Sequence, residues 1–267
     1  MDILNLQKIK RNIIIIPLLM ICTLSMAQTK GYKMTYQQRM NFSSKDINTE
    51  DRAMSEMIMN AMKDMKAYFT LTFSEGKSLF EADTKKSTQQ FGGFSNIIYT
   101  DINNNKKITQ ENSFGKRFLI EDTLENFAWT ITGEAKNING HNCTKAVLTV
   151  NSNDDVKEAL KDVEGLDLSA LGKQQITAWY SAEIPIPCGP MGFAGLPGLI
   201  AELDMNNIVY TLESIEVIND VKEIVPPSKG KKVTAKEYAE IQKKKLEEIK
   251  SNGFGFGEGG NVRVIVR

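Results

Sequence analysis

Short stretches in which apolar and polar side chains alternate recur along this chain, and they constrain its fold more than any other feature. A period of two places successive side chains on opposite faces of a half-buried β-strand. Residues 33–42 show the pattern, with four apolar side chains on one face: Met34, Tyr36, Met40 and Phe42. Further predicted strands are 69–73, 97–99, 118–120, 127–131, 146–150, 176–180, 199–203 and 208–217. Turn residues such as Glu75-Gly76 separate these segments closely, which predicts an antiparallel, meander-like sheet.

Three segments with helical periodicity interrupt the predicted strands. In residues 50–66, methionines and other apolar residues recur at i, i+3 and i+4, which predicts an amphipathic helix. Residues 154–163 show a weaker pattern of the same kind, and residues 235–250 form the third candidate. Together with the strands, these segments predict an α+β fold. We expect a large curved antiparallel sheet, shaped like a half-barrel, with two or three helices packed on its concave side.

The start of the third helix carries a specific local signal. Thr234 and Glu237 have the spacing of a capping box, in which the side chain of each residue accepts a hydrogen bond from the backbone N–H of the other residue. Val233 and Tyr238 have the spacing of a hydrophobic staple across the same turn. The sequence therefore predicts that this helix begins immediately after Thr234.

The N-terminus has the composition of a secretory signal. Three basic residues precede an apolar run at 13–22, and Ser25 and Ala27 occupy the small-residue positions before a predicted cut ahead of Gln28. Nothing later reaches membrane-spanning length, so no transmembrane segment is expected after cleavage. We therefore expect an exported protein, located in the periplasm or associated with the outer membrane or cell surface.

The domain organisation follows from this signal and from a linker near the C-terminus. Pro226-Pro227 and the polar residues after them separate the predicted sheet from the last helix, and a Gly-rich tail follows at 253–260. We predict a signal peptide at 1–27, one sheet domain at 28–225, and a linker, helix and tail at 226–267. A chain of this length has enough residues for one substantial core.

Signal removal also changes the cysteine content and the charge. Cys143 and Cys188 remain after cleavage, and an oxidising compartment favours a disulfide between them. Such a bridge would contribute about 3–4 kcal/mol in the chain-entropy model; two buried free thiols are the alternative. The whole chain has 33 basic and 33 acidic residues, and the signal removes three and one of these, leaving 30 against 32. A net charge near −2 gives no reason to expect nucleic acid as a partner.

The most specific motif is Gly195-Leu-Pro-Gly-Leu-Ile200. Pro197 and Gly198 have the chemistry of a type II turn, in which proline sets φ at the second position and glycine accepts a positive φ at the third. We therefore predict Gly195, Pro197 and Gly198 as structural turn residues that begin the strand at 199–203.

This hexapeptide resembles the signature of the GLPGLI family, exported proteins of Bacteroidota bacteria. Two upstream elements resemble that family as well: Ala178-Trp-Tyr180 followed by residues 183–190, and Ile138-Asn-Gly140 with Cys143-Thr-Lys-Ala146. The resemblance covers about Trp129–Leu203. It implies export and, by analogy, the curved sheet of lipoprotein-carrier proteins, but it supplies no activity, substrate or cofactor.

No catalytic, metal or cofactor site is predicted from the residues. His141 is the only histidine, which disfavours histidine triads and multi-histidine zinc sites. The candidate binding residues are instead aromatic or apolar: Trp179, Tyr180, Phe193, Leu196, Met57 and Met62. Of the neighbours Trp179 and Tyr180, we expect one to point inward and one outward.

These observations predict a non-enzymatic exported module that binds an apolar ligand or an outer-membrane partner, such as a receptor. Two alternatives stay open at this point. One is an envelope enzyme that uses carboxylates, and the other is a copper(I)-handling protein that uses the Met-rich helix, because thioethers select that ion. Packing of the methionines against the sheet, with no metal, is the simpler interpretation of that helix.

Overall fold

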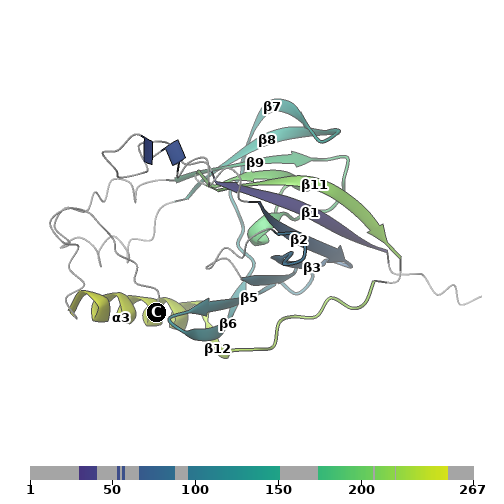
Figure 1. Ribbon diagram of the computed structural model, residues 1–267. Helices are drawn as coiled ribbons and strands as arrows, with labels where there is room; N and C mark the ends of the chain where they lie inside the picture. Colours follow the sequence, from purple (N-terminus) through teal and green to yellow (C-terminus); the bar gives the residue numbers. More distant parts are fainter. Residues whose placement is uncertain are drawn as a thin grey trace, which may run out of the picture.

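The computed structural model describes residues 30–40, 53–54, 56–57, 66–87, 96–150, 174–206, 208–219 and 221–251. Twelve strands in these ranges form one sheet (Figure 1). Their bounds are β1 Gly31–Met40, β2 Ala67–Ser74, β3 Lys77–Ala82, β4 Ile97–Asp101, β5 Lys106–Ser113, β6 Lys116–Thr123, β7 Thr130–Ile138, β8 His141–Val150, β9 Gln174–Ser181, β10 Leu199–Asp204, β11 Ile208–Ile218 and β12 Lys231–Thr234. A 3-10 helix, η2, spans Pro190–Gly192, and an α-helix, α3, spans Ala235–Ser251.

The strand order is β12-β6-β5-β4-β3-β2-β1-β11-β10-β9-β8-β7. The N-terminal strand β1 therefore lies inside the sheet, and it pairs with β11 from Gly31↔Ile218 to Met40↔Ile208. Neighbouring strands are antiparallel except at one edge, where β12 runs parallel to β6. The sheet is thus open and mixed, which corrects the expectation of a purely antiparallel one.

Alternation along the strands produces the core, as predicted. Met34 and Tyr36 on β1 are fully buried, and so are Leu203 on β10 and Tyr210 on β11. Gln38 interrupts the apolar face of β1 but is also buried, and its side-chain amide donates to the Tyr210 hydroxyl over 3.4 Å. This hydrogen bond satisfies the amide nitrogen of Gln38, whereas its buried Oε1 has no hydrogen-bond partner among the described residues.

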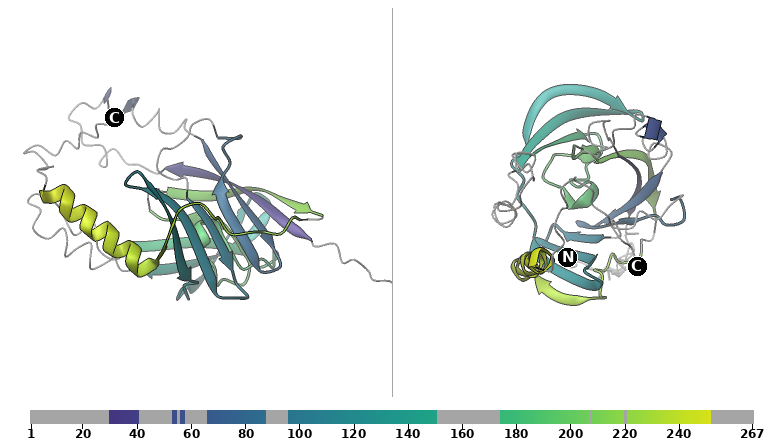
Figure 2. Two further views of the ribbon diagram at one scale, coloured as in Figure 1. Left: turned by 90° about the horizontal axis from the view of Figure 1, so that it is seen from below. Right: turned by 60° about the vertical axis from the view of Figure 1, so that its left-hand side comes forward.

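The concave side of the sheet differs from the sequence expectation. The sheet curls around the connection between β9 and β10, residues 182–198, which includes η2 (Figure 2). Ile186, Cys188 and Leu196 of this connection are buried in the main core. A loop therefore covers the concave side where helices were expected, because its apolar side chains pack against the sheet in their place.

The predicted helices have different outcomes. α3 begins at Ala235 as predicted, and the capping box is present: the Thr234 N–H donates to Glu237 Oε2 over 2.7 Å, and the Glu237 N–H donates to Thr234 Oγ1 over 3.2 Å. Tyr238 packs edge-on against Phe118 of β6, which places α3 at the sheet edge.

Two or three packed helices are not supported, since α3 is the one α-helix of substantial length in the described ranges. The predicted helix at 154–163 lies outside the described residues, as does most of 50–66, where 53–54 and 56–57 are helical. Within the described part of the chain, no helix is both long and apolar enough to cross a membrane.

Candidate functional site

The connection between β9 and β10 is built from three tight turns, each centred on a proline. The N–H after the proline donates to the carbonyl before it in every case: Ile186 to Ile184 over 2.7 Å, Cys188 to Ile186 over 2.8 Å, and Gly198 to Leu196 over 2.8 Å. Such three-residue turns need a φ near −75°, which the proline ring supplies. The prolines therefore determine the path of the loop over the core.

The hexapeptide turn differs from the predicted type II turn. Gly198 does not have a positive φ, whereas Gly195 does, at +90°. Gly198 is buried, and a Cβ atom built on it would overlap the backbone of Ser181, lying 2.7 Å from that carbonyl carbon. Glycine is therefore required at 198 by the close approach of two backbones, and at 195 by backbone conformation.

An aromatic patch lies where this connection meets the segment before β7. It consists of Phe127, Trp129 and Phe193, all of them half-buried. The Phe127 and Phe193 rings stack with centroids 4.8 Å apart, and the Trp129 ring lies 6.1 Å from each. The Trp129 indole N–H donates to the Ala194 carbonyl over 2.9 Å, which joins the two segments. The patch thus presents rigid, partly exposed aromatic surface whose polar atom is already satisfied.

Sequence reasoning identified only one member of this patch. Phe193 was among the candidates, but Phe127 and Trp129 come from another segment and were missed, since their proximity depends on the path of the loop. Leu196, another candidate, is buried and packs in the core.

The backbone of Met191, in the 3-10 helix η2, is strained, with a φ of +58° that is uncommon outside glycine.

Trp179 and Tyr180 point to opposite faces, as expected for neighbours on a strand. Tyr180 is buried in the core, whereas Trp179 is half-buried on the other face, beneath two lysine ammonium groups. Lys136 Nζ lies 4.3 Å and Lys145 Nζ 5.9 Å from the centroid of the Trp179 ring. The structure therefore separates Trp179 from Phe193 instead of bringing them into one patch.

The charges around Trp179 neutralise one another. Lys136 pairs with Glu202 over 2.7 Å, and Lys145 pairs with Glu134 over 3.0 Å. Asp204, two residues beyond Glu202, is partly buried, and that burial raises the pKa of its carboxyl. Because each lysine beside Trp179 is paired with a glutamate, this part of the sheet surface resembles an ordinary ion-paired sheet face more than a reactive cleft.

The predicted disulfide is not formed, because Cys143 and Cys188 are both free and buried. Burial raises the pKa of the Cys143 thiol to about 11 and that of Cys188 further still. Both thiols are therefore protonated at neutral pH, and a protonated thiol is a poor nucleophile and metal ligand. Among the residues that the structure describes, no group of three or more His, Cys, Asp or Glu side chains is placed to hold a metal ion.

Only one of the two methionine candidates is described by the structure. Met57 is 71% exposed, which is inconsistent with burial against the sheet at that position. Met62 lies outside the described residues.

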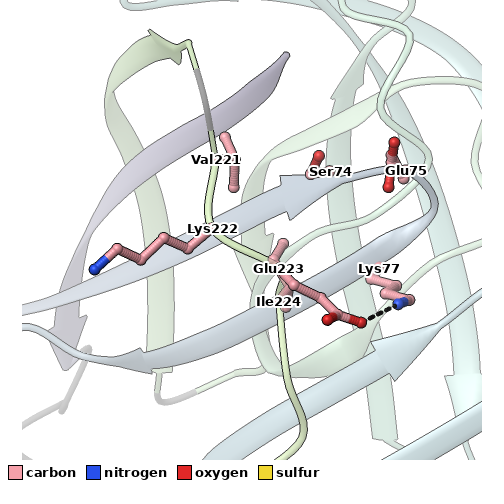
Figure 3. A pocket seen from close by; sticks show the side chains of 7 residues that line it. All are labelled: Ser74, Glu75, Lys77, Val221, Lys222, Glu223 and Ile224. Atoms are coloured by element: carbon pink, nitrogen blue, oxygen red, sulfur yellow. Dashed lines mark hydrogen bonds and ion pairs between the residues drawn. The ribbon is translucent and has the colours of Figure 1, made fainter. Parts of the chain in front are cut away.

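A separate pocket of about 230 Å³ lies beside the turn between β2 and β3 (Figure 3). Ser74, Glu75 and Lys77 line it from that turn, and residues 221–224 line it from the segment after β11. The Lys77 ammonium reaches across to Glu223 over 3.3 Å, and this hydrogen bond raises the pKa of Lys77. The pocket thus has a mixed lining, in which charged side chains lie beside the apolar Val221 and Ile224.

Fold and patch together define a class: a mostly-β protein with one large, open, mixed sheet and a proline-rich loop across its concave side. A family model described as "Protein of unknown function (Porph_ging)" matches residues 129–202, which include Trp129, Phe193 and the hexapeptide. This match does not carry the GLPGLI name. No curated protein matches the sequence.

Two solved structures of PNGF-II, in the C2 and P21 space groups, are similar to this chain. They are 18% and 17% identical to it, with a TM-score of 0.49 in both cases. The alignments cover 79% of this chain but only 32% and 33% of theirs, so this chain spans about a third of their length. A likeness of this degree carries no argument about activity.

Proposed function

We propose that this protein is an exported, non-enzymatic binding module of the cell envelope, of GLPGLI type, which docks to an outer-membrane protein partner through its aromatic patch. The observation that carries the proposal is the patch itself. Phe127, Trp129 and Phe193 are held together by stacking and by the Trp129–Ala194 hydrogen bond, yet each remains partly exposed. Rigid aromatic side chains of this kind are the usual anchors of protein interfaces.

The chemistry of the described side chains supports a binding role over a catalytic one. A nucleophilic cysteine needs a lowered thiol pKa, whereas burial raises it in both cysteines. The two lysines nearest to Trp179, Lys136 and Lys145, each form an ion pair with a glutamate. The sequence signal at 1–27 supports export, and export would bring the module to the compartment that borders the outer membrane.

The proposal can be tested with a photo-crosslinking amino acid at Ala128, an exposed position between Phe127 and Trp129. We expect crosslinks to one envelope protein in the native organism, and their loss in a Phe127→Ser/Phe193→Ser variant. The same crosslinker at Phe114, an exposed residue between β5 and β6, is the matched control and should not capture that protein. Equal capture from both positions, or no change in the double variant, would contradict the proposal.

An apolar small molecule is the other occupant to be distinguished. Trp129 and Trp179 are the only tryptophans, so Trp179→Phe makes Trp129 the sole indole reporter. If a hydrophobic probe shifts Trp129 emission and no protein crosslinks form, the occupant of the aromatic patch is an apolar small molecule and not a protein partner.

A further inference from the structure

We propose that the protein partner adds a short extended segment to the sheet, as a further strand beside β7 and next to the aromatic patch. This inference rests on the proposed docking function and specifies how the partner is recognised. The added segment would carry apolar side chains two residues apart, which cover Ile131 and Trp129. In this mode of recognition, backbone hydrogen bonds provide affinity and alternate side chains provide specificity.

β7 is the last strand at one end of the sheet, and its outer edge is open. Its one neighbour in the strand order is β8. Among the residues that the structure describes, no backbone hydrogen bond joins the other side of β7 to a further segment. Residues 130–135 are all exposed. An edge strand of this kind presents unpaired N–H and C=O groups that can pair with another chain.

The opposite edge of the sheet is protected by its sequence and by α3. β12 has four residues, two of which are lysines, and α3 follows it directly and packs against β6. Short length, lysines and a covering helix are common means of preventing strand addition. β7 has nine residues and no proline, and α3 lies at the other end of the strand order. Of the two edges, β7 is therefore the one open to a further strand.

The charged side chains of β7 do not block its edge. Lys136 Nζ lies over the Trp179 ring and pairs with Glu202 over 2.7 Å. Glu134 pairs with Lys145 over 3.0 Å. Glu202 is on β10 and Lys145 is on β8, so both pairs are formed with strands on the inner side of β7. Because these charges are already paired within the sheet, they do not oppose an incoming strand as an unpaired charge would.

The apolar core reaches the open edge at Ile131. Ile131 pairs with Ala146, which is fully buried, yet the Ile131 side chain is 52% exposed. Trp129, two residues earlier, packs against the core cluster that contains Ala146 and belongs to the aromatic patch. A segment paired with residues 130–132 would place its own side chains against Ile131, and an apolar residue there would extend burial to the edge of the core.

A bulge limits the length of the added strand and disfavours a second copy of this chain as its source. The pairing of β7 with β8 shifts register between Ile131 and Ala135, and Gly133 has a φ of +80°. Regular pairing next to the patch is thus confined to residues 130–132. In a symmetric pair of two copies centred on Ile131, Trp129 of one copy would lie opposite the bulged Gly133 of the other. Glycine has no side chain to cover the indole, whereas a different protein can supply an apolar residue there.

The test uses the complex that the crosslinker at Ala128 captures from the native envelope. Amide hydrogen exchange, measured by mass spectrometry of peptides that cover residues 130–138, compares this complex with the free protein. We expect exchange of the outward amides at 130–132 to be slower in the complex by about tenfold or more, because strand addition gives them hydrogen-bond acceptors. Peptides from β12, at the opposite edge, are the control and should exchange equally in both.

Ile131→Lys is the matching variant, because a lysine on an edge strand opposes strand addition. The exposed position of Ile131 allows the change without disruption of the core. We expect this variant to abolish capture from Ala128. Val217→Lys changes a similarly exposed valine on β11 and should leave capture unchanged.

The outcomes separate this inference from the docking proposal. Capture from Ala128 that leaves exchange of β7 unchanged, or that persists in Ile131→Lys, would overturn strand addition and leave docking through the aromatic patch intact. Capture of a second copy of this chain would overturn the assignment of the edge to a different protein. The absence of any captured protein would overturn both proposals.

Discussion

Gly198→Ala is the perturbation that best discriminates between the sequence and structural explanations of the hexapeptide. The turn chemistry predicts a left-handed glycine at 198, where alanine would cost only backbone strain. In the structure, the added methyl would instead overlap the Ser181 carbonyl, and neither backbone can rotate away as a side chain would. Overpacking of this kind costs about 1–3 kcal/mol, and contact with the backbone of both Ser181 and Ala182 places Gly198→Ala near the upper end.

Gly195→Ala is the matched control, because glycine is required at 195 by the backbone conformation and at 198 by a close backbone contact. Gly195 has a φ of +90°, but the nearest atom to a Cβ added at this position is Trp129 Cδ1 at 4.0 Å, which is ordinary contact. Its cost is therefore the left-handed conformation alone, about 1–2 kcal/mol. We expect Gly198→Ala to lower the free energy of unfolding by about 2–3 kcal/mol, and so by more than Gly195→Ala does.

Urea and thermal unfolding followed by circular dichroism would measure both variants. For a chain of this size, about 2–3 kcal/mol corresponds to a fall in Tm of about 4–12 °C. A Gly198→Ala protein as stable as wild type, or more stable than Gly195→Ala, would refute the argument from backbone contact.

Three further predictions concern buried or capping groups. Cys143 and Cys188 should react slowly with a thiol reagent in the folded protein at about pH 8 and rapidly in urea, because burial raises the pKa of both; Cys143 reactivity should rise as the pH approaches about 11. Tyr36→Phe should lower the free energy of unfolding by about 1–3 kcal/mol in urea titrations, because it removes the hydroxyl that donates to the buried Ile200 carbonyl over 2.7 Å. Thr234→Ala should cost about 1 kcal/mol and increase amide exchange in the first turn of α3, with Thr234→Ser close to wild type.

Strands with one buried face were predictable from the sequence, because their alternation reports that face directly. β1 and β2 are examples, and the turn expected at Glu75-Gly76 is confirmed, since it joins β2 to β3 in an antiparallel pair. The start of α3 was predictable for a different reason: a capping box is a local interaction that does not depend on the rest of the fold.

Strands at the two sheet edges were not predictable to the same degree. Most of β7 is exposed, so residues 132–138 have no apolar alternation to detect, and only its beginning fell within a predicted strand. In β12, Val233 is the one buried side chain, and the strand pairs in parallel with a segment more than a hundred residues earlier. Its four residues carry two lysines, a composition typical of an edge strand and equally of a linker.

The aromatic patch shows a third limit, which concerns loops. Phe127 and Phe193 are 66 residues apart, and their stacking depends on where the connection between β9 and β10 crosses the sheet. Prolines at 185, 187 and 197 indicate tight turns in the sequence, but they do not say which face the loop will cover. That choice is made by burial of Ile186, Cys188 and Leu196, which no local pattern distinguishes from an exposed apolar loop.

The position of β1 connects the fold to the proposed export. β1 is the first strand of the chain, yet it pairs with β11 along its whole length, so the two halves of the sheet join only when residues 208–218 are present. Before that pairing, β2–β6 and β7–β10 are two sets of antiparallel neighbours, and the buried side chains of β1 have only β2 beside them. Long-range pairing of this kind slows folding, because the entropy of loop closure precedes the gain from contacts. A slowly formed sheet would leave a precursor unfolded for longer, which is compatible with the export that we propose from the predicted signal at 1–27.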